Sequence, residues 1–270
     1  MEGSPDNAGV SPRAIRELFS NVDAAKDLFE YRITLSMLEI YNETIRDLLD
    51  AGGAGKKPAG LDIRQTAEGN TVVGLSEIQI SGADQVQELM KMGNSNRAVG
   101  SHDMNEHSSR SHSIITLICR GKNKKDGSST YGKLHLIDLA GSERVGKTDA
   151  SGERLKEAQN INKSLSALGD VINALGNKKA MHVPYRNSKL TFLLQDSLGG
   201  TSKVLSFVNI SPAVYNIGET VCSLNFATRC RSTELGEAKR QSGDGSGSGA
   251  AGSATKAPLR KSTASVTPRK

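Results

Sequence analysis

The chain has 270 residues, of which 36% are hydrophobic and 24% are charged, a composition typical of a globular protein with one sizeable core. Seven cations and only two anions fall within residues 237–270, so the rest of the chain is nearly neutral and the net charge of +6 is no argument for nucleic-acid binding. No apolar run is long enough to span a bilayer, and the N-terminus has no secretory signal.

The first half of the chain reads as one helix followed mainly by strands. A helix is expected over Ser11–Asn21, with Ser11 as its N-cap and Pro12 in its first turn. Alternating apolar and polar residues predict a strand at 32–37. Further expected elements are a hairpin around the turn at 68–70, a helix over 83–94, and strands over 113–120 and 133–139 joined by a polar loop at 121–130.

Three segments of the second half have clear apolar patterns. Apolar residues at 161–175 are spaced alternately by four and three, which predicts a helix that ends near Gly176. Leucines within 190–198 form a second helical stripe, and the apolar run at 204–210 predicts a strand. Strands that alternate with helices indicate an α/β sheet covered by helices on both faces.

The C-terminal part changes character after one last helix. Asn216 and Glu219 resemble a capping box for a helix through Arg231. Residues 237–270 are basic, rich in Gly, Ser and Thr, and without aromatic residues, so they cannot bury enough apolar surface to offset their ordering entropy. We therefore expect a disordered basic tail, which serves either as an electrostatic tether or phosphorylation target, or simply as a solvated end.

Two polar segments carry candidate chemistry. A strand that ends near Asp138 is followed by Gly141, and nucleoside triphosphatases use such an aspartate for Mg²⁺ and such a glycine for close approach of a backbone N–H to the γ-phosphate. The alternative is an ordinary loop with a helix-capping aspartate. Ser108–Ser111 holds three hydroxyls and Arg110, groups that bind Mg²⁺, phosphate or a carboxylate, although a plain polar loop has the same composition.

Cysteine and histidine residues give little support for a metal site. The three cysteines form no C-x-x-C pair, which fits a reducing compartment. His102, His107 and His112 recur every five residues, a spacing that suits neither one helix face nor one strand face. They are interpreted as unrelated surface and loop histidines rather than as metal ligands.

The order of the motifs is more specific than any one of them. N-x-x-S-S-R-S-H at 105–112, followed by D-L-A-G-S-E at 138–143, resembles the switch I and switch II pair of kinesins. Residues 152–169 and 182–191 resemble the family's switch II helix and microtubule-facing loop, and two further family motifs complete the order at 193–200 and 223–227. The resemblance implies a kinesin motor domain at 1–236, of the P-loop NTPase fold with helices on both faces of the sheet.

This resemblance implies ATP and Mg²⁺ as cofactors and assigns roles within the two switches. Ser108 and Ser109 would close on the γ-phosphate and Mg²⁺, and Asp138 would lie on the Mg²⁺ side. Gly141 would sense the γ-phosphate through its backbone N–H. Three other residues complete the implied set, namely Asn105 among the nucleotide-binding residues, and Arg110 and Glu143 as a salt bridge that latches the switches together.

The resemblance also implies a microtubule-binding surface. The helix over about 160–175 would carry the nucleotide-dependent change to the track, and Lys163, Arg186 and Lys189 would meet the acidic surface of tubulin; by composition alone these are solvated basic side chains. Many kinesins have Asp and a basic residue where this chain has Asn187 and Phe192. An Asn followed by an aromatic residue, with no coiled coil behind it, resembles the C-terminal motors, the kinesin-14-like subfamily.

The sequence departs from the family pattern at the phosphate-binding loop. Kinesins place G-x-x-x-x-G-K-[ST] ahead of switch I, so we expect the N-terminal part of the motor, with its first strands and this loop, to be missing from the chain. Gly141–Thr148 satisfies the pattern but overlaps switch II, and the residues after it discourage an immediate helix, so it is interpreted as a coincidental match.

The best interpretation is an ATP-driven microtubule motor represented by an incomplete catalytic domain. Microtubules are the expected partner, in the cytoplasm and on the cytoskeleton, with no nucleic acid, no membrane and a dimer through regions outside this chain. The enzymatic expectation is a microtubule-stimulated ATPase that is deficient in this chain alone. Three alternatives stay open: a non-catalytic microtubule-binding remnant, an NTPase that uses Gly141–Thr148, and a chain that does not fold stably because sheet edges lie open.

Overall fold

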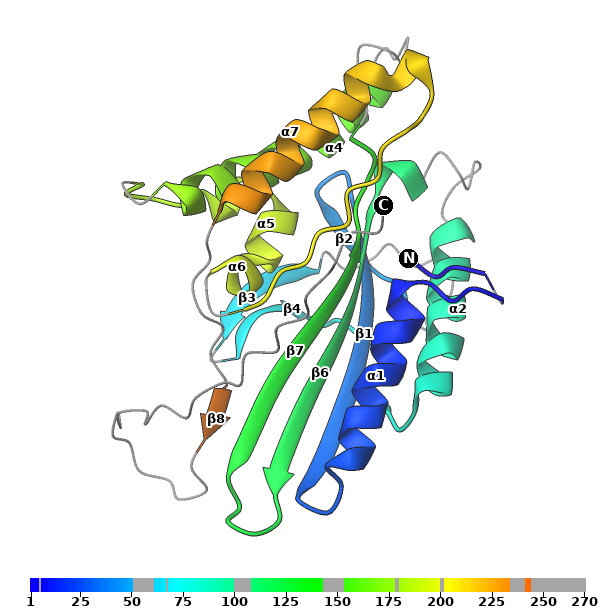
Figure 1. Cartoon of the computed structure of the whole chain (residues 1–270), viewed down its shortest axis with the longest axis vertical. Helices are drawn as coiled ribbons and strands as arrows, with labels where there is room; N and C mark the ends of the chain where they lie inside the picture. Colours follow the sequence, from blue (N-terminus) through cyan, green and yellow to red (C-terminus); the bar gives the residue numbers. More distant parts are fainter. Residues whose placement is uncertain are drawn as a thin grey trace, which may run out of the picture.

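The computed structural model describes residues 1–4, 6–50, 61–66, 68–99, 108–142, 153–177, 180–199, 202–233 and 241–243. Its centre is a sheet of three long antiparallel strands that lie in the order β1 (Phe29–Tyr41), β6 (His112–Asn123) and β7 (Ser129–Asp138) (Figure 1). Two short strands pair with β1, namely β2 (Thr44–Asp47) and β5 (Ile78–Ile80), and β8 (Gln241–Gly243) pairs with the start of β7. A separate hairpin is formed by β3 (Asp62–Thr66) and β4 (Gly69–Val73).

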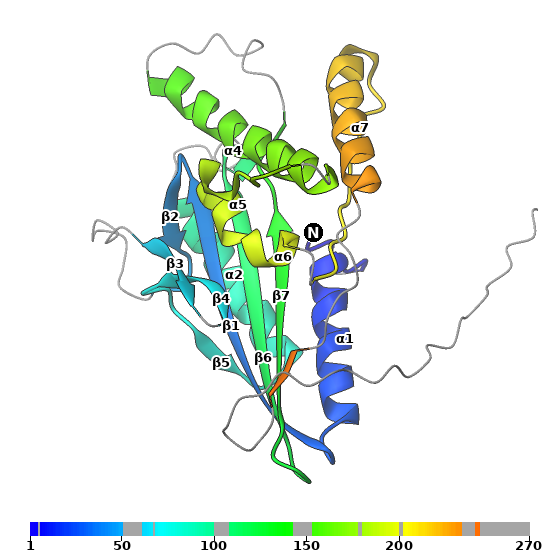
Figure 2. The ribbon, with the colours of Figure 1, turned by 90° about the vertical axis from the view of Figure 1, so that its left-hand side faces the viewer.

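Helices cover both faces of the sheet (Figure 2). The helices α1 (Val10–Ala24) and α2 (Ala83–Val99) pack on one face, and α4 (Glu153–Gly176), α5 (Lys189–Leu193) and α6 (Gln195–Leu198) lie over the other. The last helix, α7 (Ile217–Ser232), contacts α4. Two 3₁₀ turns, η2 (Tyr185–Asn187) and η3 (Val214–Asn216), complete the elements. The predicted α/β architecture is therefore confirmed.

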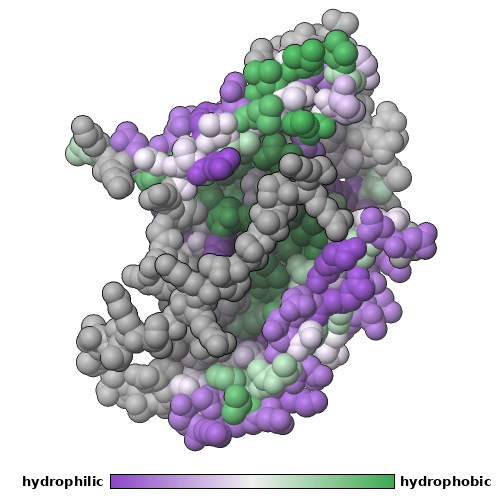
Figure 3. Space-filling model, viewed as in Figure 1, coloured by the Kyte–Doolittle hydropathy of each residue, from purple (hydrophilic) through white to green (hydrophobic). Residues whose placement is uncertain are grey.

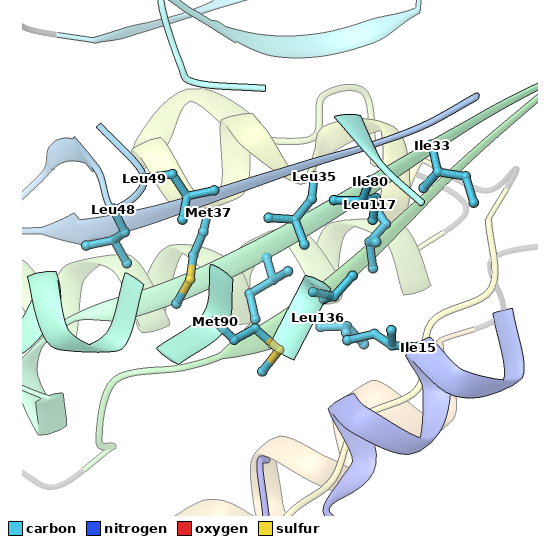
Figure 4. Packing of buried hydrophobic residues seen from close by; sticks show 12 residues of the cluster. Ile15, Ile33, Leu35, Met37, Leu48, Leu49, Ile80, Met90, Leu117 and Leu136 are labelled. Carbon is cyan, nitrogen blue, oxygen red and sulfur yellow. The ribbon is translucent and has the colours of Figure 1, made fainter. Parts of the chain in front are cut away.

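The strand alternation divides the core into two clusters. On the α1 and α2 face, Leu35 and Leu117 of the sheet pack with Ile15 of α1 and Met90 of α2 (Figure 4). On the other face, the neighbouring sheet residues contact α4 and α5, with the buried side chains Leu38, Ile40, Ile114, Leu168, Val171 and Leu190 in one cluster. Since both faces are covered, β1 is buried continuously from Ile33 to Ile40, and it is longer than the strand predicted at 32–37.

The N-terminus of α1 differs from the prediction. The helix begins at Val10, its N-cap position is Gly9, and Ser11 is buried inside the first turn. The N–H groups of Gly9 and Ser11 donate to the carbonyls of Glu2 and Met1, at 2.7 and 3.2 Å. The predicted Ser11 cap is wrong because the preceding backbone, and not a side chain, supplies the acceptors that the first turn needs.

The capping box at α7 is also wrong, although the helix itself is confirmed. Asn216 occupies the N-cap position, but its side chain makes no cap hydrogen bond. Its amide Nδ2 instead donates to the hydroxyl of Ser211 at 3.1 Å. The hydroxyl of Ser211 therefore holds the amide that was expected to cap the helix.

The apolar segment Val204–Ile210 is not the strand that its sequence predicts. Within the described part of the chain it pairs with no strand, and it exposes its large apolar side chains, among them Leu205 at 78% and Phe207 at 59%. On the same face, hydrophobic residues gather in a hollow beside the polar outer surface of α1 (Figure 3). The outer edge of β7 has a described partner only at Ser129–Tyr131. A strand pattern becomes a strand only where a neighbouring backbone offers hydrogen bonds.

None of the helices in the described residues combines the length and apolar character that crossing a membrane requires. The predicted boundary between a domain at 1–236 and a tail at 237–270 stays a prediction, because the structure describes only Gln241–Gly243 of the tail.

Candidate functional site

The two polar segments singled out in the sequence lie side by side in the structure. Strands β6 and β7 are antiparallel, with Ser113 opposite Asp138, so the residues before β6 and the residues after β7 meet at one edge of the sheet. The N–H of Gly141 donates to the carbonyl of Ser109 at 2.7 Å. The fold thus brings together the segment that ends at Ser111 and the segment that begins at Asp138, about 30 residues apart in sequence.

Arg97, at the end of α2, holds both segments and was not predicted from the sequence. Its Nη2 donates to the carbonyls of Ser108 and Ser111 at 3.1 and 3.0 Å, and its Nη1 lies 3.7 Å from Oδ2 of Asp138. Its Nε donates to the Ser111 hydroxyl at 3.2 Å. One guanidinium, with five donors in a fixed plane, therefore fixes the spacing of the two segments.

Glu39 in the middle of β1 supports this arginine. Its carboxylate side chain is 1% exposed and accepts from Nε of Arg97 at 3.3 Å. The only sequence signal was a glutamate within the apolar run Met37–Tyr41, since a buried carboxylate requires a partner. The position of Arg97 itself carried no signal that distinguishes it from an exposed helix residue.

His112 corrects the interpretation of the histidines. It is the first residue of β6, it is 2% exposed, and both ring nitrogens are engaged: Nδ1 accepts from the N–H of Ala140 at 3.0 Å, and Nε2 lies 2.7 Å from Oγ of Ser164 on α4. Burial, with a smaller contribution from the charge of Arg97, lowers the pKa of His112 to about 4. A surface or loop histidine was expected, but strand β6 begins one residue before the predicted start and carries this ring into the core.

The remaining predicted nucleotide residues differ in what the structure says of them. Ser108 and Ser109 are exposed, Arg110 is half-buried, and the side chain of Asp138 is 59% exposed. Hydroxyl and carboxylate oxygens are the hard donors that Mg²⁺ prefers, so the oxygens of Ser109 and Asp138 fit this ion. Asn105 and Glu143 lie outside the described residues. The predicted salt bridge between Arg110 and Glu143 therefore also lies outside them.

No protein cage for a metal exists in the part of the chain that the structure describes, since no three His, Cys, Asp or Glu side chains gather there. Mg²⁺ in nucleotide sites is commonly held by one or two protein oxygens together with substrate phosphates and water. The donor set at Ser109 and Asp138 is of this sparse kind.

The three basic residues predicted to face the microtubule share one surface over α4, η2 and α5. Lys163 and Arg186 line a shallow hollow that also contains Asp170. Arg186 and Lys189 line a second hollow, beside the β3–β4 hairpin. Arg186 thus borders both hollows, and the structure brings the three predicted cations into one neighbourhood.

Two of these cations have partners within the chain. The ammonium of Lys189 donates to Asp62 of β3 at 2.6 Å, and this bond holds the pKa of the Asp62 carboxyl below its ordinary value. The guanidinium of Arg186 lies over the ring of Phe192, 5.0 Å from its centroid. The aromatic residue at 192 therefore orients Arg186 by a cation–π contact.

Comparisons with known proteins agree with this arrangement. The family model described as "Kinesin motor domain" matches residues 1–233. The chain is 55% identical over 243 residues to the kinesin-like protein KIN-14R of Oryza sativa subsp. japonica and 52% identical over 242 residues to KIN-14R of Arabidopsis thaliana. Each match covers 89% of this chain but only 24% and 22% of the relatives, so the chain spans about a quarter of their length.

Solved structures give the same result. A structure described as a fast kinesin matches 90% of this chain and 67% of its own, with a TM-score of 0.79 and 45% identity. The C-terminal motor and motor homology domain of Kar3Vik1 matches 83% of this chain and 57% of its own, with a TM-score of 0.73 and 44% identity. A KIF14 dimer in complex with a microtubule matches with a TM-score of 0.78 and 38% identity, over 88% of this chain and 68% of its own.

Proposed function

The chain belongs to the kinesin motor family, and from this premise we propose that it is part of a microtubule-based motor that couples ATP binding and hydrolysis to movement. The observation that carries the proposal is the junction of the Ser108–Ser111 and Asp138–Gly141 segments, held by Arg97 and by the bond from Gly141 to Ser109. Two loops that rearrange together when the γ-phosphate is bound or lost must lie in contact with each other.

The residues at this junction divide the work of a nucleotide site. Ser108 and Ser109 would supply hydroxyls to the γ-phosphate, and the oxygens of Asp138 and Ser109 would hold Mg²⁺. When bound, Mg²⁺ neutralises phosphate charge. The N–H of Gly141 donates to Ser109 in this structure, so it reaches a phosphate only by exchanging that carbonyl for a phosphate oxygen. Arg110 and Glu143 latch the two segments once they close.

Lys163, Arg186 and Lys189 form the proposed contact with the acidic surface of tubulin. Their common surface on α4, η2 and α5 supports this role, because clustered cations raise the rate and salt dependence of binding to an acidic partner. The solved KIF14 structure is described as bound to a microtubule, and the Kar3Vik1 motor as fused to a heterodimeric coiled coil. By analogy we place the protein on cytoplasmic microtubules, as a dimer formed through regions outside these 270 residues.

The 270-residue chain alone is proposed to be a poor ATPase. Its only match to G-x-x-x-x-G-K-[ST] is Gly141–Thr148. A phosphate loop runs directly into a helix at its Lys-Thr, whereas the residues that follow here, Asp149–Gly152, disfavour an immediate helix. The N–H of Gly141 is also committed to Ser109. These observations favour a second candidate function for this chain alone, a non-catalytic microtubule-binding kinesin remnant.

Cosedimentation with microtubules tests the proposal. The chain is expected to pellet with microtubules, and Arg186→Ala and Lys163→Ala are each expected to weaken binding by about twofold to fivefold, as for a partly screened charge pair. Lys91→Ala is the matched control, because Lys91 is an exposed lysine on α2, which packs on the opposite face of the sheet. Equal loss with all three variants, or no pelleting at physiological salt, contradicts the proposed surface.

The nucleotide part is tested with the same material. Release from microtubules by MgATP supports a working nucleotide site in this chain, whereas nucleotide-independent binding supports the non-catalytic alternative. Lys147→Ala distinguishes the remaining hypothesis: complete loss of nucleotide binding supports Gly141–Thr148 as a phosphate loop, and a small effect supports the switch II assignment.

A further inference from the structure

One buried side chain touches both the Asp138–Gly141 segment and α4. His112 accepts from the N–H of Ala140 through Nδ1, so in the neutral ring the hydrogen is on Nε2, which donates to the Ser164 hydroxyl. Ser164 is 1% exposed. Burial disfavours the charged ring and so keeps it neutral, and the bond from Ala140 then selects this tautomer. Both bonds are short and shielded from water, conditions under which a hydrogen bond holds its geometry.

The start of β6 is held from both faces of the sheet. Successive side chains of a strand point to opposite faces. Accordingly Ser111 contacts Arg97 of α2, while His112 contacts Ser164 of α4. A displacement of α4 along its axis therefore changes a directional bond at His112, whereas the apolar contacts of α4 with the sheet tolerate sliding.

We propose that His112 is a positioning residue that couples α4 to the Asp138–Gly141 segment, with Ser164 as its contact on the helix and Ala140 as its contact on the loop. When tubulin displaces α4, the imidazole moves with Ser164 and shifts the backbone at Ala140, next to Gly141. The inference rests on the proposed function, because it joins the proposed tubulin-binding helix to the proposed nucleotide segment. It gives His112 and Ser164, which lie within the motifs but have no assigned role there, a positioning function and a route between the two segments.

Amide hydrogen exchange of the full chain, without microtubules, is the first test. Ser164→Ala removes the hydroxyl that holds the ring and is expected to speed exchange at Ala140 and Gly141 by about fivefold or more. His112→Asn keeps an acceptor near Nδ1 but cannot reach α4, so it is expected to act similarly. Because both variants break the same link, the double variant is expected to show no further increase.

Ser166→Ala is the matched control, since it makes the same substitution on an exposed position two residues further along α4. It is expected to leave exchange at Ala140 and Gly141 unchanged. Unchanged exchange in Ser164→Ala, or an equal increase in Ser166→Ala, overturns the proposal whether or not the chain binds microtubules. Circular dichroism of each variant establishes that the fold is intact. If His112→Asn does not fold, the result for Ser164→Ala alone decides the test.

A second test separates coupling from local packing. Microtubule binding is expected to alter exchange across 139–142 in the unchanged chain and in Ser166→Ala. In Ser164→Ala this response is expected to be lost although the variant still pellets with microtubules, which a merely structural role would not produce. A full response in Ser164→Ala overturns the coupling. Failure of the unchanged chain to bind microtubules contradicts the proposed function alone, since the exchange test without microtubules stands independently.

Discussion

At the scale of single residues, the pair Arg97–Glu39 does most to hold the site together. The carboxylate of Glu39 is buried on β1, and the guanidinium reaches from it to Ser108 and Asp138. A buried carboxylate that keeps its charge needs a cation and donors close by, so the ion pair and the geometry of the two loops depend on each other. This is why a residue in no motif positions the motif residues.

Removal of one partner of this pair is expected to destabilise the fold. Arg97→Ala removes the guanidinium that pairs with the buried Glu39 carboxylate, which is expected to cost about 3 kcal/mol in the free energy of unfolding. Urea unfolding followed by circular dichroism measures it. The control Arg16→Ala, on the exposed side of α1, is expected to change stability by less than about 0.5 kcal/mol. Full stability of Arg97→Ala would show that Glu39 needs no cation; the double variant with Glu39→Met is expected to regain part of the loss.

Two histidines, the buried His112 and the partly buried His135, predict how stability depends on pH. Burial lowers the pKa of His112 and of His135 to about 4, below the ordinary value of 6.5. The unfolded chain therefore binds more protons between pH 6.5 and about 4, so this stability is present above pH 6.5 and is lost as the pH falls. From pH 7 to pH 5 each ring is expected to cost about 2 kcal/mol.

Urea unfolding at pH 7, 6 and 5 measures this loss. His135→Gln is expected to remove about half of the histidine contribution to the pH dependence. The control is the same substitution at an exposed histidine, His182→Gln. A pH dependence that His135→Gln leaves intact would mean that this ring titrates normally in the folded chain.

At the scale of elements, the β3–β4 hairpin controls how much of Lys189 is available to a partner. Asp62 on β3 holds the ammonium at the start of α5. Asp62→Asn releases that charge and is expected to tighten microtubule binding by about twofold to fivefold, most clearly at low salt. The control is Asp126→Asn in the β6–β7 turn, far from α5 (Figure 1). Weaker binding of Asp62→Asn in cosedimentation would show that Asp62 orients Lys189 for its partner instead of competing with it.

The elements themselves were largely predictable from sequence, and the exceptions have physical reasons. Helical stripes and strand alternation predicted α2, α4, β6 and β7, because apolar periodicity reports which face is buried. The Ser11 cap failed because carbonyls of the preceding backbone supply the acceptors, and the Asn216 cap failed because the side-chain amide of Asn216 donates to the Ser211 hydroxyl instead. The site motifs predicted which loops meet, but Arg97, Glu39 and Ser164 come from three other elements, and sequence spacing does not report such contacts.

At the scale of the whole molecule, one edge of the sheet is largely unpaired among the residues that the structure describes. Beyond Tyr131 no described strand pairs with the outer side of β7, and Val204–Ile210 carries a strand-like apolar pattern without a described partner. An open edge and an exposed apolar run are the features that other chains add to. The molecule is therefore expected to self-associate through this side as its concentration rises.

Charges on this segment are expected to suppress that association. Leu205→Glu combined with Phe207→Glu places two carboxylates on side chains that are already exposed, so the free energy of unfolding is expected to change by less than about 0.5 kcal/mol. Sedimentation velocity over a concentration series measures the oligomeric state. Leu190→Ala in the buried core is the contrast, with a loss of about 2–5 kcal/mol and no benefit to solubility. Unchanged association of the charged variant would place the contact elsewhere.

The open edge also bears on the lifetime of the chain in a cell. Chaperones and proteases act on proteins that present extended apolar segments, and they do so whether or not the remainder is folded. Val204–Ile210 is such a segment, and it lies beside a well-packed sheet. We therefore expect the turnover of a polypeptide that presents this segment to depend on how quickly another part of the protein, or a partner, covers the segment after synthesis.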